Sequence, residues 1–183
     1  MSARTRVRAL AIAAVCSLAA VFAVALPSQQ VTAQAADLRA FDAGYIIGDA
    51  LFYDSGAMSA AAIQSFLVQK GSSCAAPTGN TCLKDFYQTT WTRTADTRCT
   101  GTYTGASNET AAQIIAKVAV SCGINPQVLL VMLQKEQGLV TASAGGSTVR
   151  YRSAMGYGCP DTAVCDAQYY GFFNQVYSAS IHR

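Results

Sequence analysis

Hydrophobic residues recur at helical spacing after residue 107 and predict a helix over 107–123. Ser107-Asn108 can cap its first turn, and Gly123 can end it. The apolar positions that define its buried face are Ile114, Ile115, Val118 and Cys122. Glu109 falls in the first turn of this predicted helix, where the helix dipole favours a negative charge.

A second helix is predicted immediately afterwards, over 125–137. Asn125 can cap it, and Pro126 suits the first turn because its missing N–H would have no partner there. Six consecutive apolar residues follow, 128–133, and Gly138 stands where a helix commonly ends. A helix that is apolar on all sides is a buried one, so we expect this helix in the core.

Two further helices flank this pair. Ser59 and Gly71 are predicted to bound a short amphipathic helix, whereas 72–106 has little periodicity and three cysteines, which indicates a loop region tied by disulfides. Near the end of the chain one apolar stripe predicts a final helix that faces the core. Its members are Tyr169, Phe172, Phe173, Val176, Tyr177 and Ile181.

The first 35 residues are typical of a secretory signal. Three arginines precede an uncharged, almost wholly apolar run, 9–26, and Ala33-Gln34-Ala35 provides small residues for cleavage. About 18 apolar residues could also just cross a bilayer, so an uncleaved membrane anchor is the alternative. We expect a signal peptide over 1–35 and an exported mature chain that is secreted or associated with the cell wall.

Composition narrows the class of protein. The chain carries only 13% charged residues and a formal charge of +3, and the three arginines before residue 9 account for that excess. A balanced, weakly charged mature chain does not suggest a nucleic-acid partner. We expect a monomeric, mainly α domain: 36–106 would hold the first helix and the disulfide-tied loops, and 107–183 a helical core that the sequence truncates at its C-terminus.

Six cysteines remain once Cys16, which lies in the signal segment, is set aside. An even number in an exported chain predicts disulfides, and six cysteines permit 15 pairings. We chose the local pairing, Cys74–Cys82, Cys99–Cys122 and Cys159–Cys165. The spacing does not suit zinc, and no metal or cofactor is expected.

Glu136 is the candidate catalytic residue, and it is one of only two glutamates in the chain. It lies at the C-terminal end of the apolar helix, where the dipole disfavours an anion and apolar surroundings withhold solvation. Both effects predict a raised pKa. A carboxylic acid that keeps its proton at neutral pH can protonate a glycosidic oxygen. The alternative is that 134–137 form only a solvated last turn.

A resemblance favours the catalytic interpretation. Asn125-Pro126, the apolar helix and Lys135-Glu136-Gln137-Gly138 resemble the catalytic helix of lytic transglycosylases and goose-type lysozymes. Ser153-Ala154-Met155-Gly156-Tyr157-Gly158 is similar to the Ser-then-Gly segment of that superfamily, and 170–175 to its Gly-hydrophobic-hydrophobic-Gln block. The chain from residue 40 onward also resembles exported actinobacterial proteins often labelled hemagglutinin. Gln137, in place of the usual serine, and Asn174, an extra residue, depart from the pattern.

The resemblance implies a lysozyme-like helical domain that acts on peptidoglycan. Glu136 would be the acid, and Asp161, ahead of the weaker candidate Asp166, would hold the attacking water. Tyrosines outside the core stripe suit sugar stacking. The predicted substrate-binding residues are Tyr151, Ser153, Tyr157, Tyr170 and Gln175.

Other functions were weighed against this one. A triad hydrolase would have to use His182, near the end of the chain, and no phosphate-binding glycine motif is present. The main alternative is a non-catalytic protein that binds peptidoglycan or another glycan on the same scaffold, as an adhesin would. A structural module of the cell wall without a sugar cleft is the third possibility.

Overall fold

The computed structural model describes residues 42–180, which belong to one compact unit that starts at Asp42. The predicted signal peptide, and with it the question of cleavage, lies outside the described residues, as does Ile181 of the predicted last helix. The α-helices of the described part are α1 (Asp49–Phe52), α2 (Ala60–Lys70), α3 (Ala111–Cys122), α4 (Pro126–Gln137), α5 (Thr148–Arg152) and α6 (Phe172–Ala179). None of the helices between residues 42 and 180 is long and apolar enough to span a membrane.

Short elements connect these helices. Two turns of 3₁₀-helix, η2 (Leu83–Asp85) and η3 (Ala167–Tyr169), precede and follow the central helices. The strands have two residues each and form two antiparallel pairs. β1 (Asn80–Thr81) pairs with β4 (Gly146–Ser147), and β2 (Tyr87–Gln88) pairs with β3 (Glu109–Thr110). The described part is therefore helical with minimal sheet, in agreement with the mainly α prediction.

Local capping signals place most helix ends where the sequence predicts them. The Ser59 hydroxyl accepts a hydrogen bond from the Ala62 N–H at the start of α2. The Asn125 side chain does the same for the Gln127 N–H at the start of α4. Gly138 adopts the left-handed conformation that ends α4. The predicted ends of α2 and α4 are confirmed.

The start of α3 differs from the prediction. Thr110 is its N-cap, and Thr110 and Gln113 form a reciprocal capping box. The preceding residues, 109–110, are extended because they pair with 87–88 in the small second sheet. Glu109 consequently lies in β3 and not in the first turn of a helix, and Ser107 and Asn108 do not cap α3.

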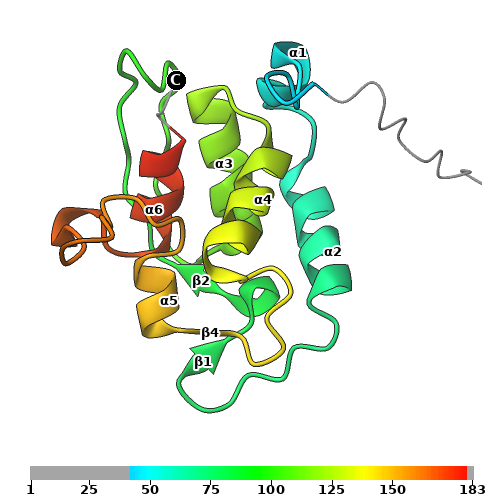
Figure 1. Ribbon diagram of the computed structural model, residues 1–183, viewed down its shortest axis with the longest axis vertical. Coiled ribbons are helices and arrows are strands. Elements are labelled where there is room, and N and C mark those ends of the chain that lie inside the picture. The colour runs from blue at the N-terminus through cyan, green and yellow to red at the C-terminus, as the bar shows by residue number, and fades with distance from the viewer. Residues whose placement is uncertain (1–41, 181–183) are drawn as a thin grey trace, which may run out of the picture. The chain divides into compact units, whose positions relative to one another are not determined.

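Helix α3 is the centre of the core. It contacts α2, α4 and α6, and in Figure 1 α2 and α6 lie on opposite sides of it. Its buried face consists mainly of Ile114, Ile115, Val118, Ala119 and Cys122. Helix α4 lies beside it and is not buried on all sides, contrary to the prediction: Leu129 and Leu133 are buried, but Val131 is 66% exposed. A helix at the edge of a small core can bury only one face, so an apolar run does not by itself imply complete burial.

The three local disulfides are those predicted: Cys74–Cys82, Cys99–Cys122 and Cys159–Cys165. Disulfides persist in oxidising surroundings, so they indicate an extracellular or secreted protein. Cys99–Cys122 joins the end of α3 to a long excursion, 89–106, in which Arg93 and Tyr103 exchange main-chain hydrogen bonds. This excursion runs along α6 (Figure 1), against which Trp91 and Tyr103 pack through Phe173.

Helix α6 confirms most of the predicted apolar stripe. Phe172, Phe173, Val176 and Tyr177 are buried. Tyr169 lies in η3 instead, because Gly171, with φ of 100°, separates η3 from α6. The last described helix thus packs on the core and places its N-terminus close to the loop that follows α5.

Candidate functional site

Glu136 occupies the last turn of α4 and lies at the surface. Its side chain is 35% exposed, and its Oε1 atom is 3.3 Å from the Nζ atom of Lys135. The deep apolar burial that the sequence suggested is therefore not found. One side of the carboxylate is nevertheless covered by the loop after α5.

The covering segment is the Ser153–Gly158 loop, which lies against Glu136 at Gly156. A Cβ atom built on Gly156 would lie only 3.1 Å from the Oε2 atom of Glu136. Gly156 also has a φ of +66°, a conformation that residues with side chains rarely adopt. Glycine is thus favoured here both by the backbone turn and by the proximity of the carboxylate.

Gln175 holds this loop in place from α6. Its side-chain oxygen accepts hydrogen bonds from the N–H groups of Met155 and Tyr157, at 3.1 and 3.0 Å. Its side-chain nitrogen donates to the carbonyl oxygens of Tyr157 and Tyr169, at 2.9 and 2.8 Å. Gln175 is 0% exposed, so it positions the loop beside Glu136 and does not face a ligand.

Helix α4 makes its own connection to the same loop. The Gln137 side-chain amide donates to the carbonyl oxygen of Ser153, at 3.3 Å. The Ser153 hydroxyl, predicted to bind substrate, donates to the carbonyl oxygen of Val149 within α5. Gln137, which replaces the serine expected from the resemblance, therefore has a structural partner in this chain.

A hollow of about 470 Å³ opens beside Gly156. It is lined by Met132, Met155, Gly156, Tyr157, Gly158, Tyr169 and Ala179. Glu136 is not one of these lining residues. It adjoins the hollow through Gly156, which its carboxylate contacts, and through Met132, which is one helical turn before it on the same face of α4. Tyr157 and Tyr169 contact each other edge to face, with ring centroids 4.6 Å apart. The hollow itself offers apolar methionine surface and two phenol rings to a ligand.

The remaining predicted residues lie elsewhere. Tyr151 is in the core, where it stacks on Phe86 and donates to the carbonyl oxygen of Thr81. Burial raises the pKa of its phenol. Tyr170 donates to the carbonyl oxygen of Cys165 and lines a separate hollow of about 420 Å³.

The two candidate aspartates are in or next to the Cys159–Cys165 loop. Asp161 is exposed, and the residues that line the hollow beside Glu136 do not include it. Asp166 caps η3 by accepting from the Gln168 N–H. The structure thus places Glu136 against the loop that contains Tyr157 and that Gln175 holds. Neither Glu136 nor Asp161 belongs to the lining of the hollow.

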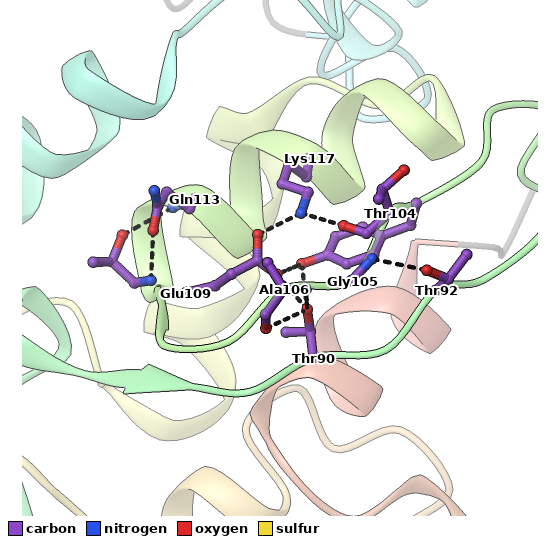
Figure 2. A network of polar contacts seen from close by, with 10 residues as sticks. Thr90, Thr92, Thr104, Gly105, Ala106, Glu109, Gln113 and Lys117 are labelled. Atoms are coloured by element: carbon purple, nitrogen blue, oxygen red, sulfur yellow. Dashed lines mark hydrogen bonds and ion pairs between the residues drawn. The ribbon is translucent and has the colours of Figure 1, made fainter.

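The other glutamate has an environment that the sequence analysis missed. Glu109 is 5% exposed and receives hydrogen bonds from the Thr90 hydroxyl, the Tyr103 hydroxyl and the Lys117 ammonium group (Figure 2). The Lys117 ammonium also donates to the carbonyl oxygen of Thr104. Glu109 is buried because β3 pairs with β2, and local sequence does not reveal a pairing between distant segments. The only feature of the sequence that could have drawn attention to Glu109 is that the chain has just two glutamates.

The network decides the ionisation of this carboxyl. Burial acts to raise the pKa of Glu109, but the hydrogen bonds from Lys117, Thr90 and Tyr103 outweigh it and hold the pKa below its ordinary value. Burial in turn raises the pKa of the Tyr103 phenol. Glu109 is therefore a charged structural anchor that joins β3 to the excursion and to α3.

The described residues, 42–180, contain no cluster of three or more histidine, cysteine or acidic side chains that could hold a metal ion. No family model, curated protein or solved structure matches this chain.

Proposed function

We propose that this protein is an exported glycosidase that cleaves peptidoglycan, with Glu136 as the general acid. The observation that carries the proposal is the contact of the Glu136 carboxylate with Gly156, which belongs to the wall of a hollow that Tyr157 and Tyr169 also line. Phenol rings pack against the apolar faces of sugars and donate hydrogen bonds at their tips. A carboxyl group beside such a surface can reach the oxygen that joins two sugars.

In the proposed reaction, a saccharide in the hollow covers the exposed part of the Glu136 side chain. Loss of water favours the uncharged acid, which then donates its proton to the bridging oxygen as the glycosidic bond breaks. The leaving sugar departs as an alcohol. The carbon left with positive charge must then be attacked by a second group.

Either water or a hydroxyl of the sugar itself can attack this carbon. If a substrate-induced shift brings Asp161 toward the opposite face of the sugar, Asp161 accepts a proton from water and the reaction is inverting hydrolysis. Without it, the 6-hydroxyl of the same sugar attacks that carbon and closes an anhydro ring, and its proton passes to the Glu136 carboxylate. The exposed position of Asp161, outside the wall of the hollow, favours the second route.

Two observations support peptidoglycan as the substrate. The resemblance in the segments around Glu136 and Gly156 is to enzymes of the bacterial cell wall. The three disulfides support an extracellular or secreted location, and peptidoglycan also lies outside the cytosol. We infer a secreted or wall-associated, lysozyme-like enzyme that needs no cofactor.

The deciding experiment compares Glu136→Gln with the unaltered protein on purified peptidoglycan. Glu136→Gln keeps the size of the side chain and removes the proton donor, so release of soluble fragments should fall by about a hundredfold or more. Lys135→Gln is the matched control on the same turn and should retain most of the activity. Equal release by Glu136→Gln and the unaltered protein would refute the role of Glu136.

Product analysis then separates the two routes. Anhydro ends in the fragments and normal activity in Asp161→Asn support attack by the 6-hydroxyl. New reducing ends, together with loss of activity in Asp161→Asn, support hydrolysis.

Glycan binding without turnover is the second candidate function. The lining of the hollow favours it, because Glu136 does not belong to that lining and binding needs no proton donor. This candidate predicts saturable binding to peptidoglycan, no released fragments from the unaltered protein, and unchanged binding in Glu136→Gln.

A further inference from the structure

A second hollow, of about 500 Å³, lies next to the one beside Glu136. Tyr157 and Tyr169 belong to the walls of both. The remaining walls come mainly from the excursion, 89–106, and from α6. The charged residues that line it are Arg93, Asp96 and Arg98. A ligand that occupies the first hollow could therefore extend past the two tyrosines into a space with more positive than negative charge.

Arg93 is held rigidly in this hollow. Its guanidinium carbon lies 5.5 Å from the ring centroid of Trp91 and 5.6 Å from that of Tyr177, both within the range of cation–π attraction. Its Nη2 atom donates to the side-chain oxygen of Asn174, at 3.0 Å. The side chain is partly buried, so its position is set before any ligand arrives.

The charge of Arg93 is not neutralised within the described part of the chain. The ion pairs formed among residues 42–180 do not include it, and its buried Nε atom has no hydrogen-bond partner there. An arginine normally uses its planar fork of donors on a carboxylate or a phosphate. Arg93 therefore lines the hollow with a charge that no carboxylate of residues 42–180 pairs, which suits an anionic ligand.

The neighbouring charges leave this site cationic. The Asp96 carboxylate accepts from the N–H groups of Cys99 and Arg98, and these bonds hold its pKa below the ordinary value. Its other oxygen is 3.5 Å from the Nη2 atom of Arg98. Asp96 is thus engaged with its own turn, and two arginines face the hollow against this one carboxylate. The Arg98 side chain is 60% exposed and free to reorient toward a ligand.

We propose that this hollow, defined by Arg93 and Arg98, binds a carboxylate on the peptide side chains of peptidoglycan. The proposal rests on the proposed function, because it assigns the sugar to the hollow beside Glu136 and the acidic peptide to its neighbour. The chain would then distinguish peptidoglycan from uncharged glycans such as chitin. Arg93 would bind the carboxylate with its fixed guanidinium, and Arg98 would close over it from the surface.

The test measures binding in the Glu136→Gln background, so that no ligand is consumed. The probes are a disaccharide-tetrapeptide released from peptidoglycan and the same compound with its carboxyl groups converted to methyl amides. Trp91 is the only tryptophan of the chain and lies against Arg93, so its fluorescence reports occupation of this hollow. The acidic probe should bind about tenfold more tightly than the amide, the size expected for one charge-assisted interaction.

Substitutions assign that preference to the arginines. Arg98→Gln should remove most of the preference for the acidic probe, and because position 98 is exposed, the protein should still fold. Arg93→Lys should reduce the preference, because the planar guanidinium is lost while the positive charge stays. Lys70→Gln is the matched control, because it removes one positive charge beside a different hollow. It should retain the full preference. Higher salt should weaken binding of the acidic probe alone.

The outcomes separate this proposal from the proposed function. Equal affinity for the two probes, or a full preference in both Arg98→Gln and Arg93→Lys, would overturn the carboxylate site while leaving peptidoglycan cleavage by Glu136 untouched. A preference for the acidic probe that depends on the arginines supports the site even if the unaltered protein releases no fragments. In that case the second candidate function, glycan binding without turnover, would acquire its charge specificity from Arg93 and Arg98.

Discussion

Gly156 lies directly against the carboxylate of Glu136, so closely that a methyl group at Gly156 would be 3.1 Å from the Oε2 atom. Gly156→Ala should therefore displace the carboxylate or the loop. Because small displacements of a catalytic group are expensive, we expect activity on peptidoglycan to fall at least about tenfold. The left-handed backbone adds strain of about 1–2 kcal/mol to the folded state.

Gly79→Ala is the control that separates these two effects. Gly79 also has a positive φ, of 88°, but no atom lies within 4 Å of the Cβ it would acquire. It should show a similar loss of thermal stability and normal cleavage. Equal loss of cleavage in both variants would mean that backbone strain, and not contact with Glu136, is responsible.

Gln175→Leu should destabilise the protein, although the two side chains are similar in size. The substitution leaves the buried N–H groups of Met155 and Tyr157 without their acceptor, and one unsatisfied buried group costs about 1–3 kcal/mol. Urea unfolding should show a loss of at least about 2 kcal/mol. Gln127→Leu, at an exposed position of α4, should change stability by less than about 0.5 kcal/mol.

Lys117→Met tests the buried network around Glu109. It leaves the carboxylate buried with only the Thr90 and Tyr103 hydroxyls, so the free energy of unfolding should fall by about 2 kcal/mol. This is less than the roughly 3–5 kcal/mol expected for a fully buried pair, because the Lys117 side chain is 34% exposed. Chemical denaturation at neutral pH would measure it, and an unchanged midpoint would show that the ion pair contributes nothing.

The pKa of Glu109 predicts how stability depends on pH. Its pKa is lower in the folded than in the unfolded chain, so the stabilisation is complete above the unfolded value, about 4.3, and is lost as pH falls through the folded value. In Glu109→Gln, the part of the free energy of unfolding that Glu109 loses at low pH should not change with pH. Asp96, whose pKa is also lowered, remains in both proteins, so the comparison isolates Glu109. Parallel curves of unfolding free energy between pH 2 and 6 would contradict the assignment.

The Cys99–Cys122 disulfide should stabilise the chain more than the other two. It closes 23 residues, against 8 and 6 for Cys74–Cys82 and Cys159–Cys165, and a longer closed loop removes more entropy from the unfolded state. Replacing both Cys99 and Cys122 by Ala should lower stability by about 3 kcal/mol. Thermal unfolding of the three paired-alanine variants should place this one lowest.

The features predicted correctly from sequence are those determined by neighbouring residues. Ser59 and Asn125 cap their helices through side-chain oxygens that reach two or three residues ahead, and Gly138 ends α4 by its own backbone freedom. The disulfides also join cysteines that are close along the chain. Such signals need no knowledge of what packs against the segment.

The features that were wrong or missed depend on distant segments. Glu109 is in a strand because 87–88 pairs with it, and Val131 is exposed because nothing covers that face of α4. Gln175 was expected in a cleft, but its side-chain oxygen and nitrogen both form hydrogen bonds with the main chain of the loop after α5. The pattern around Glu136 predicts its helix and its partner loop, but not the arginine hollow, which requires the excursion to fold back on α6.

Tyr103 links the buried network of Glu109 to helix α6. Its hydroxyl donates to Glu109, and its ring packs on Phe173 of α6, two residues before the side chain that fixes the Gly156 turn. A substitution that weakens the packing of Tyr103 on Phe173 should consequently displace the Gly156 turn. A screen for impaired cleavage should therefore recover substitutions at Tyr103 or Thr90, and kinetic defects there would report on scaffolding and not on chemistry.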